Sequence, residues 1–457
     1  MTSGPSPRPV RRAPAEFSLP VDRTHLARRL ATAPDWLIAD RTAGFDAYDA
    51  LLPETNLLYT TYLDLRPADL AETTIVEVGD GMPATPGAAL PDGVDGVLEI
   101  HDGIVVSAGL SADARAAGVT LGSLTDLVAT DPDWARALLD GTGTLPDDDR
   151  FAQLTRALWN VGTVLDVPAG VTLARPILLR WASGTPGLAV IGRTVIRLGD
   201  GAAASIVEEL VPSGAGQNGP QSFLAGSSEV TLGAGAALSV ASIQELGPRA
   251  ITFQHRTARI GEGASLHWAL AQLGSRMTRS RVDNRLEGDR SSVEQVEIVF
   301  GGADQLFDLT SYTRHVGRDT TGNLLSKGAL LDKARGFMKG MITIDRSAVG
   351  TDSYLGEFGM NLSREARSVA IPSLEIDQPD CRRAAHASSV GPIDEAQLFY
   401  LESRGIPPDE ARKFIVLGFL EPVVARVPLA DAQDRLRSLL EEKWDAGSGG
   451  PAADAAA

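Results

Sequence analysis

A degenerate repeat in the middle of the chain constrains the fold more than any other feature. Three copies join an alternating apolar run to a Gly-x-Gly turn, at Ile196–Ala202, Val230–Ala236 and Ala258–Ala264. Successive copies are offset by 34 and then 28 residues, and a period of about 20 to 50 residues indicates a solenoid, a propeller or another array. Because each copy supplies two short strands, it fits one coil of a flattened parallel β-helix better than a four-stranded propeller blade.

The same alternation predicts which side chains face the interior of such a coil. None of the Gly-x-Gly pairs has the third glycine of a dinucleotide-binding loop, so we interpret them as turns in which glycine accepts a positive φ. The side chains expected to form the inward aliphatic stacks are Val195, Leu198, Ile206, Val230, Leu232, Leu238, Val240, Ile260, Leu266 and Trp268.

Helical patterns flank the repeat on both sides. A first helix can begin at Asp22 or Thr24, and apolar residues recur at helical spacing in 36–52. Tyr59–Leu65 looks extended. The chain is therefore predicted to be mainly β, a flattened parallel β-helix flanked by N- and C-terminal α-helical subdomains. The expected boundaries are a disordered start at 1–16, an N-terminal helical region at 17–73, a β-helix core at 74–391 with helical insertions at about 121–160, a C-terminal helical subdomain at 392–445 and a disordered tail at 446–457.

Charge and cysteine content exclude several classes of protein. The 42 Lys and Arg residues against 59 Asp and Glu residues give a net charge of −17, which repels nucleic-acid phosphates and anionic lipid headgroups. The sequence has no apolar run long enough to span a membrane. Its single cysteine, Cys381, leaves no intrachain disulfide and no self-contained cysteine-rich metal site. We therefore expect a cytoplasmic protein that binds neither nucleic acid nor membrane.

A search for catalytic signatures is negative, and we do not expect an enzyme. The sequence has no Gly-Lys dipeptide, hence no Walker A loop, and neither His-Glu-x-x-His nor Gly-x-Ser-x-Gly. Asp147–Asp149 is interpreted as a solvated loop, and His255 and His267 as structural histidines with satisfied hydrogen bonds. Four arginines in a strand-like stretch are expected to form a solvated or interfacial face: Arg276, Arg279, Arg281 and Arg285.

The most specific signal is a long motif in the C-terminal third. Asn361–Ile376 is followed by His386–Ile406, then by Ala411 and Gly418–Phe419. This motif closely resembles the SufB/SufD family, the paralogous scaffold proteins of the SUF iron–sulfur cluster assembly machinery. The resemblance implies a right-handed parallel β-helix between helical subdomains, in agreement with the repeat. Further matches lie at Phe151, Val167–Val171, Pro176–Ile177 and Leu331–Gly336, so the resemblance covers about 151–419.

Within that family, the residues around His386 resemble the SufD branch. SufB-like chains carry a cysteine two positions before the shared histidine and a glutamate after it, and here those positions are Ala384 and Ala387. The resemblance implies that His386 is a candidate cluster ligand at the SufB–SufD interface. Cys381 stands off the family position, and its odd offset from His386 in an extended strand would point it to the opposite face. We therefore interpret Cys381 as a small, half-buried hydrophobic residue.

The C-terminal helices are expected to bind a second partner. Their apolar stripes are predicted to comprise Ala411, Phe414, Ile415 and Gly418 on one helix and Leu436, Leu439 and Leu440 on the last helix. One interpretation is that the stripes bury only against each other and the end of the β-helix. The resemblance implies instead that this subdomain docks SufC, an ABC-type ATPase. The residues assigned to that contact are Phe399, Arg404, Gly405, Phe414, Gly418 and Phe419.

These observations predict a non-catalytic, SufD-like scaffold subunit that pairs with a SufB-like chain and docks SufC. One chain with one cysteine is not expected to hold a cofactor, because iron–sulfur clusters usually need several thiolates. The cluster would be assembled transiently with the partner, and flavin binding by the complex has no readable motif here. The closest alternative is a homodimeric scaffold of the same family. A polysaccharide-acting β-helix enzyme is less favoured, because such enzymes present acids, arginines and aromatics along an open groove.

Overall fold

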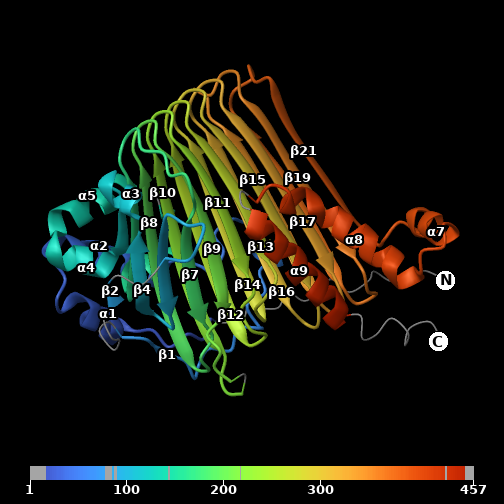
Figure 1. Cartoon of the computed structure of the whole chain (residues 1–457), viewed down its shortest axis with the longest axis horizontal. Coiled ribbons are helices and arrows are strands. Elements are labelled where there is room, and N and C mark those ends of the chain that lie inside the picture. The colour runs from blue at the N-terminus through green and yellow to red at the C-terminus, as the bar shows by residue number, and fades with distance from the viewer. Residues whose placement is uncertain are drawn as a thin grey trace, which may run out of the picture.

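The computed structural model describes residues 17–77, 85–86, 90–142, 145–216, 218–427 and 430–447. Within them the chain forms a parallel β-solenoid of two facing sheets, with helices before and after it in the sequence (Figure 1). Strands β6 to β21 alternate between the sheets, so consecutive pairs from β6–β7 to β20–β21 make eight described coils. The predicted mainly β solenoid is confirmed. The expected start at 1–16 and residues 448–457 of the expected tail lie outside the described residues, whereas 446–447, also expected in the tail, end helix α9 (Ala430–Gly447).

The two sheets are named A and B here. Sheet A contains β1 (Thr74–Ile75), β5 (Thr120–Ser123), β6 (Val161–Val167), β8 (Leu188–Leu198), β10 (Ser222–Leu232), β12 (Ala250–Ile260), β14 (Met277–Leu286), β16 (Leu306–His315), β18 (Arg335–Ile344) and β20 (Arg367–Ile376). Sheet B contains β2 (Thr85–Pro86), β3 (Gly96–His101), β4 (Ile104–Leu110), β7 (Ile177–Ser183), β9 (Ala203–Pro212), β11 (Ala237–Gln244), β13 (Ser265–Gln272), β15 (Ser292–Gly301), β17 (Thr321–Leu330), β19 (Asp352–Asn361) and β21 (Arg383–Gly391).

The helices fall before, at the start of and after the solenoid. They are α1 (Arg23–Leu30), α2 (Asp35–Ala50), α3 (Ala112–Ala116), α4 (Leu124–Thr130), α5 (Pro132–Thr142), α6 (Arg150–Leu158), α7 (Glu395–Ser403), α8 (Pro408–Val424) and α9 (Ala430–Gly447), with a 3₁₀ turn at Thr60–Tyr62. None of the helices in the described part of the chain is long and apolar enough to cross a membrane.

The repeat predicted from the sequence sets the register of the coils. Leu198, Leu232 and Ile260 are register partners on β8, β10 and β12. The Gly-x-Gly turns that follow them stack on one another, since the amide of Gly201 donates to the Ala234 carbonyl at 2.8 Å. Gly201 has a φ of 66°, and the equivalent glycines of the next two turns are also positive in φ. Glycine is needed there because L-residues rarely adopt this conformation.

Nine of the ten predicted inward side chains lie in the apolar cluster between the sheets. The prediction for Val195 is wrong: Ile196 and Leu198 face inward, and Val195 lies in the separate cluster beneath the N-terminal helices. The reason is that sheet A is covered on both faces. A strand buried on both sides reads as a continuous apolar run, which hides the two-residue alternation.

The N-terminal helices cover the outer face of sheet A. The carboxylate of Asp22 caps α1 by accepting the Thr24 amide at 2.9 Å, as predicted. Beneath the helices, Phe17 and Phe151 pack edge to face at 5.0 Å, and Phe151 contacts Phe253 of β12 at 4.7 Å between ring centroids. This cluster joins the first described residue to the middle of the solenoid.

The expectation of an extended segment at Tyr59–Leu65 is wrong. Thr60–Tyr62 forms a 3₁₀ turn, because the Asn56 side chain organises the chain just before it. The Asn56 carboxamide oxygen accepts the Leu58 amide at 3.0 Å, and the Asn56 carbonyl accepts the Tyr59 amide at 2.9 Å. Asparagine commonly starts a turn in this way.

The C-terminal helices α8 and α9 lie across the outer face of sheet B (Figure 1). Leu436 and Leu440 of α9 are buried there among Ala241, Ile243 and Ile298 of β11 and β15. The interpretation that these helices pack only on each other and the end of the β-helix is therefore wrong. They close a third apolar layer over the face of the solenoid and leave its last coil uncovered.

Candidate partner and cluster interface

The solenoid ends in two strands that each have a neighbour on one side only. In the described part of the chain, β20 pairs with β18 at the end of sheet A, and β21 pairs with β19 at the end of sheet B. Apolar side chains lose their cover at this end: Ile376 of β20 and Val390 of β21 are exposed, and Leu374 is only partly buried. A row of free backbone groups beside exposed apolar side chains is a surface suited to pairing with another chain.

His386 lies on β21 at this open end. Its register partner on β19 is Leu355, which is buried between the sheets, so His386 belongs to the inward-facing row of sheet B. With no further coil above it, the imidazole is exposed. Ala384 lies two residues earlier on the same row. Any group supplied to this row by a second chain would meet the imidazole directly.

Cys381 lies in the turn before β21, which begins at Arg383. The thiol is half-buried and packs on the apolar cluster of the last coils with Ile344 and Leu355. The expectation of a half-buried hydrophobic residue is met, but the predicted opposite orientation is wrong. Strand alternation does not apply to a residue outside the strand.

The inner row of β19 carries a buried carboxyl near the open end. Glu357 is the register partner of Ser388 on β21 and accepts the amide of Ile371 at 2.8 Å. Burial raises the pKa of Glu357 to about 8, despite that hydrogen bond. The sequence does not single out Glu357, because a lone glutamate in an alternating strand does not reveal which face it occupies.

The described residues contain no cluster of three or more His, Cys, Asp or Glu side chains that could hold a metal ion. The open end supplies one exposed imidazole, and the cysteine Cys381 is half-buried in the turn before β21. A metal site here would need ligands from another molecule.

Helix α7 is almost unpacked. It packs against α8 and extends away from the solenoid (Figure 1), and none of its residues is buried. Phe399 is 71% exposed, and Tyr400 is also exposed, with the Arg404 guanidinium 5.2 Å from its ring centroid. Gly405, with a φ of 88°, ends the helix. Exposed aromatic side chains contribute little to the folding stability of their own chain. Two of them together on one helix are typical of a binding surface.

Helix α8 has two different faces, so the single apolar stripe predicted on it is wrong. Val416, Leu420 and Val424 pack into the outer layer of sheet B. Phe414 lies on the opposite side and is 64% exposed, and a side chain at Gly418 would meet no other atom within 4 Å. The helix begins at Pro408, with Asp409 and Glu410 in its first turn, where the helix dipole favours acidic residues.

Phe419 differs from the other residues assigned to partner binding. Its ring is partly buried, and the Lys327 ammonium lies 4.6 Å from the ring centroid. The same ammonium donates to the Phe419 carbonyl at 2.8 Å. These contacts attach α8 to β17, so Phe419 has a structural role in addition to any role in binding.

The prediction of a solvated acidic run is wrong for Asp149, which is buried. Its carboxylate caps α6 by accepting the Phe151 and Ala152 amides, both at 2.8 Å. It also lies 3.1 Å from the guanidinium groups of Arg279 and Arg281. Burial opposes ionisation, but these two cations hold the pKa of Asp149 well below its usual range. An Asp directly before a helical pattern is an N-cap signal that could have identified it.

The four arginines predicted to form one solvated or interfacial face differ in burial. Arg279 and Arg281 are buried under the N-terminal segment, whereas Arg276 and Arg285 keep partial exposure, as expected. His255 is buried with its Nε2 2.8 Å from Asp283, but its Nδ1 has no hydrogen-bond partner among the described residues, so the prediction of satisfied hydrogen bonds holds for one ring nitrogen only. The expectation for His267 is wrong, because that side chain is exposed on β13.

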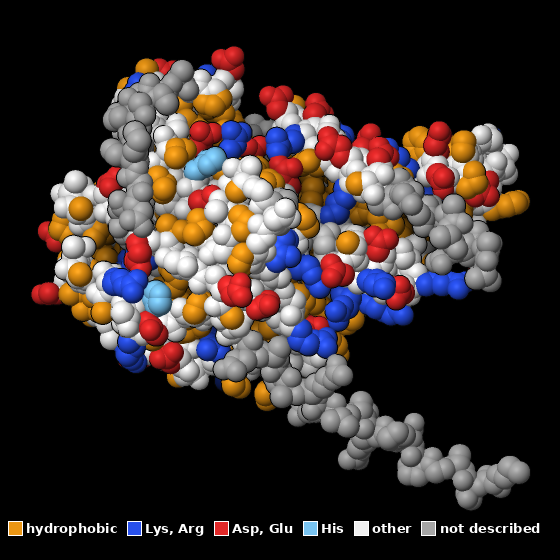
Figure 2. Space-filling view, turned by 90° about the horizontal axis from the view of Figure 1, so that it is seen from below, with side chains coloured by type: hydrophobic (Ala, Val, Ile, Leu, Met, Phe, Trp, Pro, Cys, Tyr) orange, Lys and Arg blue, Asp and Glu red, His pale blue; other side chains and the backbone are white. Residues whose placement is uncertain are grey.

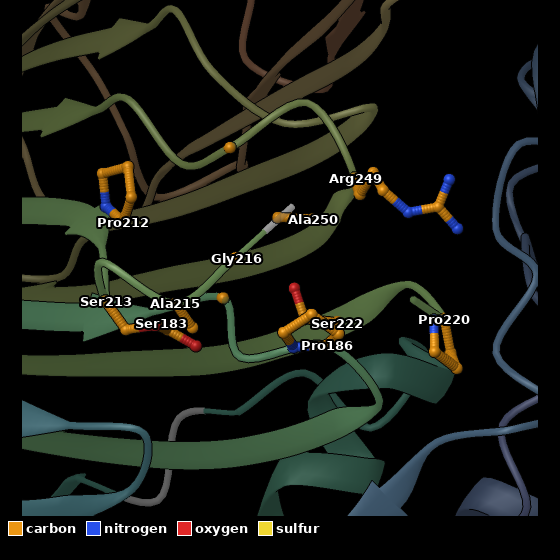
Figure 3. A pocket seen from close by; sticks show the side chains of 12 residues that line it. Ser183, Pro186, Pro212, Ser213, Ala215, Gly216, Pro220, Ser222, Arg249 and Ala250 are labelled. Atoms are coloured by element: carbon orange, nitrogen blue, oxygen red, sulfur yellow. The ribbon is translucent and has the colours of Figure 1, made fainter. Parts of the chain in front are cut away.

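The pocket drawn in Figure 3 is small. It lies among the loops around Ser183, Ser213, Ser222 and Arg249, and its cavity volume is about 10 Å³. That is enough for one water molecule.

On the face drawn in Figure 2, Lys and Arg side chains alternate with Asp and Glu rather than forming one basic patch.

Comparison with known proteins gives consistent matches. The family model described as "SUF system FeS cluster assembly, SufBD core domain" matches residues 181–419. The iron-sulfur cluster assembly protein SufD of Bacillus subtilis is 28% identical over 335 residues, which cover 73% of this chain and 76% of that protein. An iron-sulfur cluster assembly SufBD family protein of Mycobacterium tuberculosis is 27% identical over 312 residues, covering 67% of this chain and 76% of the relative.

Proposed function

The chain belongs to the SUF-system SufBD family of iron–sulfur cluster assembly proteins and is a SufD homologue, and on this basis we propose that it is a non-catalytic, SufD-like scaffold subunit. In this role it pairs with a SufB-like chain through β20 and β21 and docks SufC through α7 and α8. The observation that carries the proposal is the open end of the solenoid, where two edge strands, exposed apolar side chains and His386 lie together.

An uncovered solenoid end favours a partner on physical grounds. Solenoid proteins normally finish in a capping unit with a polar outer face, because the last repeat would otherwise expose its core. Here the last coil presents Ile376 and Val390 instead. A second chain pairing at this end would bury both and satisfy the free backbone groups of the edge strands.

His386 is proposed to supply one imidazole nitrogen to iron held at that interface. Its exposed place on the inward row fits this limited role, and the thiolates would come from the SufB-like chain, because Ala384 offers no ligand and Cys381 is packed in the turn. The cluster is the cargo of the assembly and is built in the complex. Flavin binding by that complex stays a prediction.

Docking of SufC is proposed at α7 and the exposed side of α8. Phe399 and Phe414 are exposed aromatic residues on these two neighbouring helices, and Gly418 leaves open space beside them. Exposed aromatic residues are common anchors of protein interfaces. Arg404 and Gly405 shape the end of α7, while Phe419 secures α8 to the solenoid.

Co-purification of variants tests the pairing. Val390→Asp places a charge on an exposed edge position of β21 and should release the SufB-like chain while SufC stays bound. Val106→Asp is the matched control, because Val106 lies toward the other end of sheet B and is exposed to the same degree, 40% against 39%. Release of the SufB-like chain by the control alone, or by neither variant, contradicts the proposal.

The same experiment separates the homodimeric alternative. A chain that purifies as a homodimer, is dissociated by Val390→Asp and captures no SufB-like protein would be a homodimeric scaffold of this family. Both outcomes use the same edge strands, so the identity of the captured chain decides between them.

A further inference from the structure

A short segment after α2 exposes two consecutive leucines. Leu57 is 86% exposed and Leu58 is 56% exposed. Single apolar residues on a surface are ordinary, so exposure alone does not point to function. The segment is unusual because the residues on both sides of the leucines are firmly held by the solenoid.

The anchors come from Asn56 and Tyr59. The side-chain Nδ2 of Asn56 donates to the Tyr312 hydroxyl on β16 at 3.1 Å, and the Tyr59 hydroxyl donates to the Gly340 carbonyl on β18 at 3.0 Å. Tyr59 is fully buried. The backbone is thus fixed on both sides of Leu57 and Leu58, which lowers the entropy that a partner would have to remove to order them.

The anchored segment lies next to the open end of the solenoid. Gly340, which accepts the Tyr59 hydroxyl, is the register partner of Pro372 on β20, the last strand of sheet A. Proline is tolerated in sheets mainly on such edge strands. The leucines therefore stand over the outer face of the sheet beside the edge that is proposed to meet a second chain.

The charge of the last coils does not oppose a second solenoid chain at this end. Residues 276–383, which form most of the last four coils, contain sixteen Lys and Arg residues and sixteen Asp and Glu residues. The whole excess of negative charge lies elsewhere in the chain. A second solenoid can approach this neutral end without the repulsion that it would meet along the rest of the molecule.

We propose that Leu57 and Leu58 form a second contact surface of the scaffold, packing against the second solenoid chain that joins the open end. The inference rests on the proposed pairing and extends it from the edge strands to the N-terminal segment. In this arrangement one partner touches both the end of sheet A and the segment that covers its outer face.

The test measures the dissociation constant between the full chain and the SufB-like subunit. The double variant Leu57→Ser/Leu58→Ser should raise this constant at least about tenfold, with an unchanged melting temperature and unchanged SufC binding. Leu57→Lys alone should also raise the dissociation constant. This substitution should not disturb the fold, because the Leu57 side chain has almost no contacts within its own chain. Val106→Ser is the control for loss of an exposed apolar residue far from the open end.

The outcomes distinguish this inference from the proposed pairing. A dissociation constant within twofold of the unsubstituted value, in a chain whose Val390→Asp variant no longer binds, overturns the leucine contact and leaves the pairing intact. A lowered melting temperature in both leucine variants also overturns it, because the leucines would then serve the fold. If Val390→Asp has no effect either, the pairing itself fails. Loss of SufC in place of the SufB-like chain rejects the occupant named here.

Discussion

Leu355 on β19 and His386 on β21 are register partners on one inward-facing row of sheet B, but only Leu355 is buried. The difference arises because β19 is covered by another coil and β21 is not. His386 lies in a row whose other members pack in the core, but the core of its own chain does not cover it. Its position is explained if a second molecule completes the row.

The first prediction concerns that histidine. His386→Ala should leave the complex assembled and lower its iron and acid-labile sulfide content by at least about half, because an iron site would lose one ligand. Cys381→Ala is the control and should change that content little, since the thiol packs in a turn. Normal iron and sulfide in the His386→Ala complex, or a loss confined to Cys381→Ala, would refute the ligand assignment.

The second prediction concerns the exposed side of α8. Phe414→Asp should abolish SufC binding and leave the melting temperature of the isolated chain within about 2 °C, because the ring is mostly in solvent. Leu420→Ala on the buried side of the same helix should instead cost about 2 to 5 kcal/mol of folding free energy. Binding assays and thermal melts of both variants separate the two faces. A collapsed melt for Phe414→Asp would mean that the ring supports the fold.

The third prediction concerns the buried charges beneath the N-terminal segment. Asp149→Ala removes a helix cap and leaves Arg279 and Arg281 without their shared carboxylate, so it should cost about 3 to 5 kcal/mol in urea denaturation. Asp148→Ala, one residue earlier and mostly exposed, should cost less than about 1 kcal/mol. Equal costs for the two variants would contradict the buried network.

The fourth prediction is a pH dependence from Glu357. Its pKa is raised from 4.5 in an unfolded chain to about 8, so the folded state holds a proton that the unfolded state has released between these values. That contribution to stability is complete below pH 4.5 and is lost as the pH rises toward 8. Glu357→Gln does not titrate, so its folding stability should not fall over this range. Between pH 6.5 and pH 8 the difference in folding free energy should therefore shift by about 2 kcal/mol in favour of the variant. Parallel curves of stability against pH for the two chains would contradict a raised pKa of Glu357.

The sequence predicts the solenoid well because its repeat is local. The alternation around Leu232 and Ile260 fixes both the turn and the inward face, and stacking then follows from the period. Val195 was misassigned because the N-terminal helices bury the outer face as well. For the same reason Arg279 was expected in a solvated or interfacial face: a strand pattern reveals two faces but not what covers the outer one.

The candidate interface could be predicted in part. The motif around His386 identified the family, and the absence of neighbouring ligands could be read from Ala384. The exposure of Phe414 could not be predicted, because Ala411, Phe414 and Gly418 share a helical stripe in sequence while the packed side of α8 is set by sheet B. The leucines at 57 and 58 had no distinguishing pattern, since their meaning depends on anchors more than 250 residues away.

The most direct test of the scaffold role compares the chain alone with the chain co-expressed with SufB-like and SufC-like proteins. Native mass spectrometry with iron and sulfide analysis should find no stable cluster and no nucleotide hydrolysis by the chain alone, and one complex containing all three proteins after co-expression. A stoichiometric, persistent iron–sulfur cluster in the chain purified alone would contradict the account.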